Sequence, residues 1–155
     1  MPLYAAAEGG CYQMMISTKG RYALRVMIDL ADHNTGKYIP LKDIAARQDI
    51  SQKYLESIVG ILSKAGFVSG QHGKGGGYKL ARTPDSYTVG SILKLSEGSL
   101  APVSCLEVGE NACKQAAECR TLPLWTELYR MIDTFLEGVT LADLANQANS
   151  GNYVI

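Results

Sequence analysis

The sequence lacks the features that mark several common functional classes. Its 155 residues contain no run of about 18 apolar residues, so we expect no membrane-spanning helix. The glycine-rich stretch QHGKGGGYKL (71–80) matches neither the loop that cradles nucleotide phosphates nor the dinucleotide-binding pattern. There are only two histidines, no C-x-x-C pair and no Ser-His-Asp arrangement. We therefore expect a protein that is not an enzyme, and a redox or metal-handling enzyme stays only as an alternative.

The composition favours one compact domain with appended segments. Hydrophobic residues make up 46% of the chain and charged residues 19%, an ordinary globular balance. Residues 1–13 contain no Lys or Arg and no long apolar run, so we expect a disordered extension or tag rather than a secretory signal. Four cysteines in a chain of this size fit a cytoplasmic thiol or metal context better than a disulphide framework.

The net charge of zero hides an asymmetry between the two parts of the chain. Residues 15–84 carry eleven Lys or Arg and five Asp or Glu, a net charge of +6. Residues 85–155 carry four bases and nine acids, a net charge of −5. A basic half beside an acidic half indicates that the basic half meets a polyanion. A membrane surface is the weaker alternative, because no strongly basic amphipathic helix is present.

Helical and strand patterns follow one another in the order typical of a winged helix-turn-helix. Apolar residues at three- and four-residue steps predict helices over 17–33, 39–50 and 52–66. Two short β-prone segments, 67–69 and 78–81, are joined by the glycine-rich stretch and predict a hairpin with a flexible, basic tip. The expected fold is therefore mainly α with a small β-hairpin wing.

This architecture predicts a DNA-binding domain over residues 14–84. The third helix of such a domain enters the major groove and its first turns face the bases. The candidate readers there are polar or amphipathic: Ser51, Gln52, Lys53, Tyr54, Glu56 and Ser57. His72 and Lys74 at the hairpin tip, with Lys19 and Arg21 in the first helix, are expected to contact the DNA backbone or minor groove. A merely solvated helix face and a plain surface hairpin are the alternatives, which the charge asymmetry disfavours.

Residues 85–121 predict a linking helix, over 88–98, and then a cysteine-containing sensor loop. Cys105, Cys113 and Cys119 are spaced C-x7-C-x5-C. Three thiolates on a flexible segment can converge on one metal or iron–sulphur cluster, although most such sites need four ligands. Two of the thiols could instead form a redox disulphide, or all three could be incidental. The fourth cysteine of the chain lies in the N-terminal extension and is treated as incidental.

The last recognisable element is a dimerisation helix with an end segment over residues 122–147, followed by a tail over 148–155. Its apolar residues recur at helical spacing. The stripe could pack on its own domain, but helix-turn-helix readers usually need two half-sites, so pairing with a second copy is favoured.

On these stretches the sequence resembles the Rrf-type winged-helix regulators, the family of IscR, NsrR and CymR. The matching stretches are STKGRYALRVMIDLA (17–31), PLKDIAARQDIS (40–51), KYLESIVGILSKAGFVSGQHGKGGGYKLAR (53–82), CRTLPLW (119–125) and IDTFLEGVTLADL (132–144). The resemblance implies a homodimeric transcription factor, usually a repressor, that binds an imperfect palindrome in DNA. It also implies that Tyr54, Glu56 and Ser57 read bases and that His72 takes a position where family members can place a minor-groove arginine.

In the cluster-binding branch of this family three cysteines hold an iron–sulphur cluster, and Cys105, Cys113 and Cys119 match them in order. The branch takes a fourth ligand from a histidine or an aspartate, and Leu122 and Arg21 occupy those positions here. The fourth ligand, and a two-iron or four-iron cluster, therefore stay open. The candidates are Glu107, Glu110, Glu118, His33, a small thiol and the other subunit. The alternative is a CymR-like regulator of cysteine and sulphur metabolism without a cluster, gated by a partner enzyme or by thiol oxidation.

Overall fold

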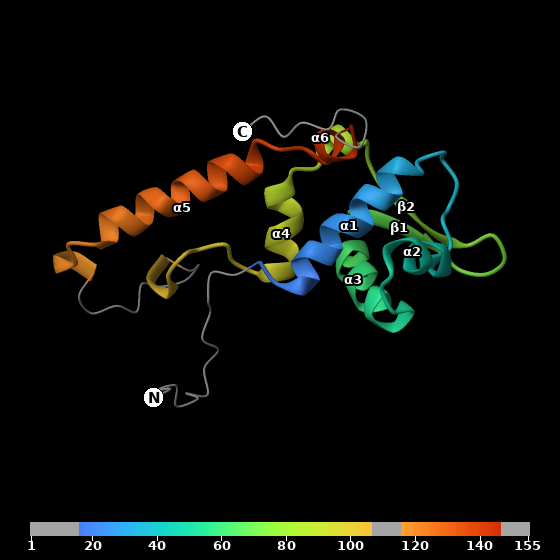
Figure 1. Cartoon of the computed structure of the whole chain (residues 1–155), viewed down its shortest axis with the longest axis horizontal. Helices are drawn as coiled ribbons and strands as arrows, with labels where there is room; N and C mark the ends of the chain where they lie inside the picture. The colour runs from blue at the N-terminus through green and yellow to red at the C-terminus, as the bar shows by residue number, and fades with distance from the viewer. Residues whose placement is uncertain (1–15, 107–115, 147–155) are drawn as a thin grey trace.

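The computed structural model describes residues 16–106 and 116–146 of the chain. It is mainly helical, with one two-stranded sheet (Figure 1). The helices and strands are α1 (Thr18–Asp32), α2 (Leu41–Gln48), α3 (Gln52–Lys64), β1 (Val68–Gln71), β2 (Gly77–Leu80), α4 (Val89–Glu97), α5 (Leu122–Glu137) and α6 (Leu141–Asn146). Three 3-10 turns connect them, at Pro84–Ser86, Ser104–Leu106 and Ala116–Glu118. The predicted fold class, a mainly α winged helix-turn-helix, is confirmed.

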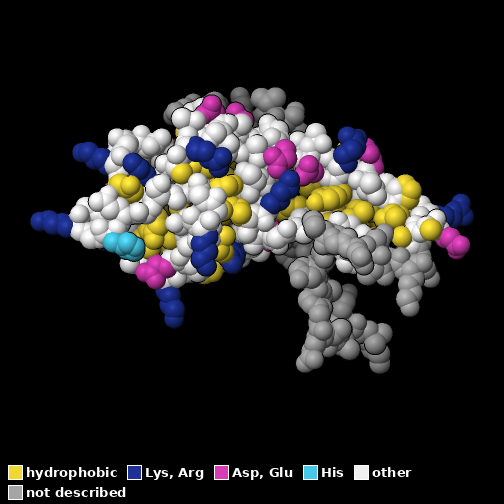
Figure 2. All heavy atoms as spheres, turned by 180° about the vertical axis from the view of Figure 1, so that it is seen from behind, with side chains coloured by type: hydrophobic (Ala, Val, Ile, Leu, Met, Phe, Trp, Pro, Cys, Tyr) yellow, Lys and Arg dark blue, Asp and Glu magenta, His cyan; other side chains and the backbone are white. Residues whose placement is uncertain are grey.

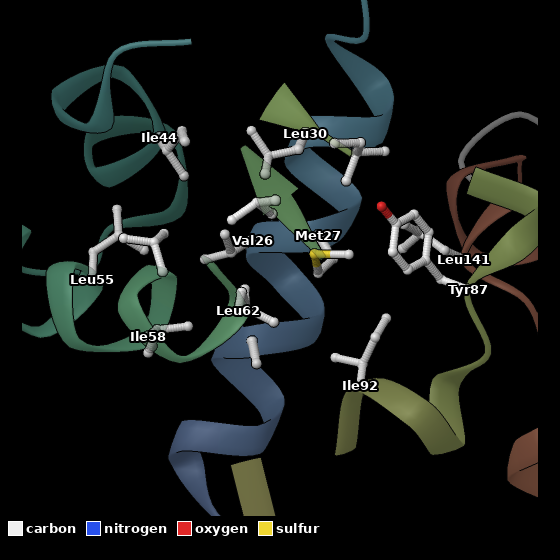
Figure 3. Close-up of a cluster of buried hydrophobic side chains, with 14 of the residues drawn as sticks. Val26, Met27, Leu30, Ile44, Leu55, Ile58, Leu62, Tyr87, Ile92 and Leu141 are labelled. Atoms are coloured by element: carbon white, nitrogen blue, oxygen red, sulfur yellow. The ribbon is translucent and has the colours of Figure 1, made fainter. Parts of the chain in front are cut away.

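The core lies where α1, α2 and α3 meet, and the last elements of the chain close it from the other side. Figure 3 shows side chains from these helices and from the later segments pointing toward one another across α1. The labelled members are all buried: Val26, Met27, Leu30, Ile44, Leu55, Ile58, Leu62, Tyr87, Ile92 and Leu141. Burying one such aliphatic side chain contributes about 1.5–3 kcal/mol, so this cluster holds α1, α2 and α3 together as one unit.

Local capping fixes where α1 and α3 begin. The Ser17 hydroxyl accepts a hydrogen bond from the Gly20 N–H at 3.1 Å, and the Ser51 hydroxyl accepts one from the Tyr54 N–H at 3.2 Å. Between α2 and α3 the chain turns at Asp49, whose φ of 53° lies in the left-handed region. An aspartate tolerates this conformation better than most residues, so the turn is short and well defined.

The wing is an antiparallel hairpin in which Val68 faces Leu80. A further bridge joins Tyr78 to Ile39, with N–H to O distances of 2.8 Å in both directions. The sequence predicted that the second helix begins at residue 39, whereas α2 begins at Leu41. The difference arises because the backbone of Ile39 pairs with the sheet. At Gly77 (φ 148°) a Cβ would lie 2.1 Å from the Ile39 carbonyl oxygen, so only glycine fits there.

The predicted helical segment 122–147 contains two helices in the structure. α5 ends at Glu137, and Val139 O then accepts a hydrogen bond from Val89 N at 2.8 Å. A reciprocal cap starts α6: Thr140 N donates to Asp143 Oδ2 at 2.9 Å, and Asp143 N donates to Thr140 Oγ1 at 3.1 Å. The chain therefore folds back onto the core, while α5 stays outside it.

α5 extends away from the predicted DNA-binding domain, which consists of α1, α2, α3 and the wing and is called the reader domain below. It meets this domain chiefly through α4 (Figure 1). No residue of α5, which the structure describes in full, is buried. Three large apolar side chains on it are about two-thirds exposed: Leu124 (60%), Met131 (59%) and Phe135 (65%). Figure 2 shows hydrophobic side chains as a band along this part of the molecule. Within residues 16–106 and 116–146, no helix is both long enough and apolar enough to cross a lipid bilayer.

Candidate DNA-binding surface and cysteine segment

The first turns of α3 present polar side chains to solvent. Gln52, Lys53, Glu56 and Ser57 are exposed, while the apolar stripe of the helix faces the core. The alternation follows from the helical period, which separates the two sets of residues onto opposite faces. Ser51 is also exposed, but its hydroxyl oxygen is already used as the cap of α3. The structure thus brings five of the predicted readers to one exposed helix end.

Tyr54 differs from the other predicted readers because it is half-buried. Its ring packs edge-on against Tyr22 of α1, with the ring centroids 5.8 Å apart. In α1 itself, Arg21 is exposed and donates from Nη2 to the Thr18 hydroxyl at 3.1 Å, whereas Lys19 is half-buried. Arg21 is thus more accessible to solvent than Lys19, and the packing of Tyr54 on Tyr22 joins α3 to α1.

The tip of the wing exposes His72 and Lys74. Gly73 (φ 89°) and Gly75 (φ 77°) have left-handed backbone conformations, and the Gly76 N–H donates to the Gly73 carbonyl at 3.0 Å. These glycines make the tight turn that projects the two side chains. Figure 2 shows Lys and Arg side chains projecting from the end of the molecule that carries the wing. A basic reader helix and a basic wing at one end of the molecule match the polyanionic surface of DNA.

A polar network between α1 and α2 was not predicted from the sequence. Asp29 is buried, and its carboxylate accepts hydrogen bonds from Arg47 and Gln48 at the end of α2. Burial alone would raise the pKa of Asp29, but the hydrogen bonds from Arg47 and Gln48 outweigh it and hold the pKa below its ordinary value. The sequence contained one sign of this network: Asp29 lies directly before Leu30, inside the apolar stripe of α1, where a charged residue needs a partner.

The described part of the cysteine segment contains two unpaired thiols. Cys105 lies in the turn after α4 and Cys119 lies three residues before α5, and both are half-exposed. Cys119 Sγ is 3.4 Å from the Thr121 hydroxyl; this hydrogen bond and the nearby backbone N–H groups lower the pKa of the thiol. Cys113, the third predicted ligand, lies outside the described residues. Within 16–106 and 116–146, no three His, Cys, Asp or Glu side chains are grouped to hold a metal ion.

Of the four side chains of this chain that are candidates for the fourth ligand, two lie in the described residues. Glu118 is exposed next to Cys119, whereas Glu107 and Glu110 lie outside the described residues. His33 is at the C-terminal end of α1, where its Nδ1 is 2.8 Å from the Asp29 carbonyl oxygen. The turn that holds Cys105 lies on the side of the molecule where α1 begins, away from the C-terminal end of that helix (Figure 1). His33 of the same protomer is therefore badly placed for the cysteine segment.

A three-helix core with an exposed reader helix and a two-stranded wing defines a winged helix-turn-helix DNA-binding protein. The chain belongs to the Rrf2 family, whose profile, described as an iron-dependent transcriptional regulator, matches residues 16–147. It is therefore a transcriptional regulator that binds DNA. The expectation that it is not an enzyme is also confirmed, because its relatives are regulators.

Individual relatives cover most of the chain. The transcriptional regulator IscR of Aliivibrio salmonicida is 39% identical over 131 residues, 84% of this chain and 77% of that protein. Protein rrf2 of Nitratidesulfovibrio vulgaris is 40% identical over 141 residues, 88% of this chain and 90% of the relative. The solved structure of CymR, the global cysteine regulator of B. subtilis, superposes with a TM-score of 0.69 and 39% identity, covering 85% of this chain and 96% of CymR. The chain is thus similar to both an IscR and a CymR.

Proposed function

We propose that this chain is a homodimeric repressor that binds a palindromic operator and senses iron–sulphur or redox status through Cys105, Cys113 and Cys119. One observation carries the proposal. The cysteine segment joins α4, which packs on the reader domain, to α5, whose apolar face is exposed. A change in the order of that segment would alter how the two readers of a dimer are held relative to each other. We place this activity in the cytoplasm, where regulators meet DNA.

The proposed reading of DNA uses the exposed start of α3. Gln52 and Glu56 carry side chains suited to adenine and cytosine edges, while Lys53 suits guanine or a phosphate. Tyr54 and Ser57 complete the base-facing set, and Ser51 adds its backbone at the helix N-terminus. Further phosphate contacts come from a set that surrounds the reader: Lys19, Arg21 and Lys74. His72 is assigned to the minor groove beside the wing.

The proposed dimer forms through the exposed face of α5. Leu124, Leu128, Met131 and Phe135 are separated by four, three and four residues, the spacing of a two-stranded helical seam. Asp133 and Glu137 lie on the other side of the helix, where both form ion pairs with Lys94 of α4. One side of α5 is thus tied to its own protomer, and the apolar side is left for a second copy.

The chemistry of the two described thiols, Cys105 and Cys119, suits ligands of an iron–sulphur cluster. Cys105 and Cys119 are unpaired and half-exposed, and the lowered pKa of Cys119 favours the thiolate, the form that binds metal. We propose that these two cysteines and Cys113 would hold the cluster, with the fourth ligand from Glu107, Glu110, Glu118, a small thiol or the second subunit. A bound iron–sulphur cluster supplies a group that responds to iron supply and to oxidants.

A second candidate is a CymR-like regulator without a cluster. Its support is the likeness to the B. subtilis cysteine regulator over 85% of this chain. Leu122, where the cluster branch has a histidine, fits this candidate too. In that case the signal would come from a cysteine-metabolism enzyme bound to the regulator, or from oxidation of the half-exposed Cys119 thiol.

Anaerobic purification followed by an absorbance spectrum and iron and acid-labile sulphide analysis separates the two candidates. The cluster proposal expects a brown protein with stoichiometric iron and sulphide. It also expects that Cys105→Ala, Cys113→Ala and Cys119→Ala each remove the cluster and leave a folded dimer. A colourless protein that still binds a specific DNA duplex would favour the CymR-like candidate.

A further inference from the structure

We propose that Asp29 is the positioning residue of the DNA reader, acting through Arg47 and Gln48 to fix the turn that sets the start of α3. The inference rests on the proposed reading of DNA by α3. Asp29 itself cannot contact DNA, because its side chain is only 1% exposed. Its effect must therefore pass through the residues that it holds.

The carboxylate of Asp29 is bound from one direction by the last turn of α2. Arg47 makes a two-pronged contact, with Nε donating to Oδ2 at 3.0 Å and Nη2 donating to Oδ1 at 2.7 Å. Gln48 adds a third bond from Nε2 to Oδ2 at 2.9 Å. The Arg47 side chain is 35% exposed, so it reaches inward from the surface to a buried acceptor. Bidentate arginine–carboxylate pairs restrict orientation as well as distance, so α2 can neither slide nor rotate freely on α1.

Arg25, one turn before Asp29 in α1, extends this contact to the turn of the motif. Its Nε donates to Gln48 Oε1 at 3.1 Å, and its Nη2 donates to the Gln48 carbonyl oxygen. Gln48 is thus held by α1 through both its side chain and its backbone. It is the last residue of α2, and only Asp49, Ile50 and Ser51 separate it from the reader helix.

The same stripe of α1 also touches the reader helix directly. The Arg25 guanidinium lies over the Tyr22 ring, 5.1 Å from its centroid, and Tyr22 packs edge-on against Tyr54 in the first turn of α3. Tyr22, Arg25 and Asp29 follow one another at three- and four-residue steps, so they share one face of α1. This face contacts the end of α2 and the beginning of α3, the two points between which the turn runs.

Base readout tolerates little displacement, which is why the network matters for specificity. Hydrogen bonds weaken steeply when their angle falls below about 120°, so a small rotation of α3 costs contacts to base edges. Contacts to phosphates are longer-ranged and survive such a shift. Loosening the network should therefore weaken binding to a preferred DNA sequence more than it weakens non-specific binding to an unrelated sequence.

The experiment compares two aspartate variants from the same helix. A duplex is first selected by the wild-type protein from a random-sequence pool, and a scrambled duplex of equal length serves as the non-specific probe. Asp29→Asn removes the buried carboxylate. Asp32→Asn, at an exposed position of α1, makes the same change of charge without touching the network and is the matched control. Both duplexes are titrated at one salt concentration, with protein shown by circular dichroism to be folded.

We expect Asp29→Asn to bind the selected duplex about tenfold to a hundredfold more weakly, the effect of losing a base contact, and to bind the scrambled duplex as wild type does. Asp32→Asn should match wild type on both. In backbone amide spectra, the changes caused by Asp29→Asn should centre on residues 48–54. If Asp29→Asn is unfolded, Arg47→Lys replaces it: this variant keeps the charge, loses the two-pronged contact and should show a smaller loss of the same kind.

A lower melting temperature with an unchanged ratio of the two affinities would overturn the inference and leave Asp29 a purely stabilising residue. An equal loss on both duplexes would overturn it as well. In either case a wild-type protein that selects a duplex would leave the proposed function standing. A wild-type protein that selects no sequence at all would overturn the proposed function and, with it, this inference.

Discussion

At the scale of single residues, the proposed sequence readout depends on which side chains of α3 face DNA. Lys53 is exposed in the first turn of the helix, and Lys64 is exposed at its last residue. The two lysines make the same contribution to net charge but lie at opposite ends of the reader. A comparison of the two therefore separates a local contact from the general attraction of a basic surface.

We predict that Lys53→Ala weakens binding to the selected duplex, because it removes a base or phosphate contact. If the contact is to a phosphate, binding should weaken about equally on all sequences and the dependence of log affinity on log salt should fall by about 1. Lys64→Ala is the control and should change neither. Equal effects of the two substitutions in a salt titration would remove Lys53 from the reader.

A second prediction at the residue scale concerns Asp29 and how the stability of the fold depends on pH. Its pKa is lowered in the folded protein from an ordinary value of 3.8, so the folded state favours the carboxylate. The contribution of the Asp29 carboxylate to stability is fully present above its pKa in the unfolded chain. It is lost as the pH falls through its pKa in the folded protein. The difference in free energy of unfolding between wild type and Asp29→Asn should be about 1–3 kcal/mol at neutral pH and should shrink below about pH 4.

Urea unfolding at several pH values measures that difference. Asp32→Asn is again the control, because its side chain is exposed. A difference between wild type and Asp29→Asn that stays constant down to acidic pH would contradict the assignment of Asp29 as a stabilising carboxylate.

At the scale of elements, the wing depends on Gly77. A Cβ there would lie 2.1 Å from the Ile39 carbonyl oxygen, and the φ of 148° is also unfavourable for other residues. We predict that Gly77→Ala breaks the bridge between Ile39 and Tyr78 and costs about 1–3 kcal/mol of stability. Gly60→Ala, within α3 and with no atom within 4 Å of the added Cβ, should be neutral or stabilising by up to about 1 kcal/mol. Urea denaturation of both variants measures this, and equal stabilities would show that the wing tolerates a side chain at residue 77.

The second element that allows a prediction is α5. Met131→Glu places a charge in the middle of the exposed apolar face and should shift the protein from dimer to monomer, because the charge would be buried in the seam. Thr126→Glu adds the same charge on the opposite side of the helix, at an exposed residue, and should leave the dimer intact. Analytical ultracentrifugation decides. A dimer that survives Met131→Glu would place the interface elsewhere.

Most elements could be predicted from the sequence, and the exceptions have identifiable causes. The periodic stripes predicted α1, α3, α4 and α5, and the glycines between β-prone segments predicted the wing. The bridge at Ile39 and the return of the chain at Thr140 depend on partners far away in the sequence, so local patterns could not reveal them. Likewise, nothing in the spacing of Asp29 shows that two α2 side chains bury it. The helical period was enough to predict which side chains of α3 are exposed. The packing of Tyr54 on Tyr22 could not be predicted in this way, because it depends on the tertiary fold.

At the scale of the whole molecule, α4 connects the reader domain to α5. At its C-terminal end, Glu97 accepts hydrogen bonds from the backbone and hydroxyl of Ser17, at 2.9 and 2.7 Å, at the start of α1. At its N-terminal end, the hydroxyl of Thr88, the residue that caps α4, donates a hydrogen bond to Glu137 Oε2 of α5 at 2.7 Å. The reader domain and the proposed dimer helix are thus held by opposite ends of one short helix. The cysteine segment begins just after that helix, so its state can bias how the halves are joined.

The measurement that tests the proposed sensor role of the cysteine segment most directly is the affinity for the selected duplex, taken anaerobically before and after treatment with an oxidant or an iron chelator. We predict that the wild-type affinity changes by about fivefold or more, a normal size for coupling between two sites. Cys105→Ala, which should stay a folded dimer, should bind with an affinity that neither treatment alters. A wild-type affinity that stays constant, or a variant that responds as wild type does, would contradict the proposal that the cysteine segment is the sensor.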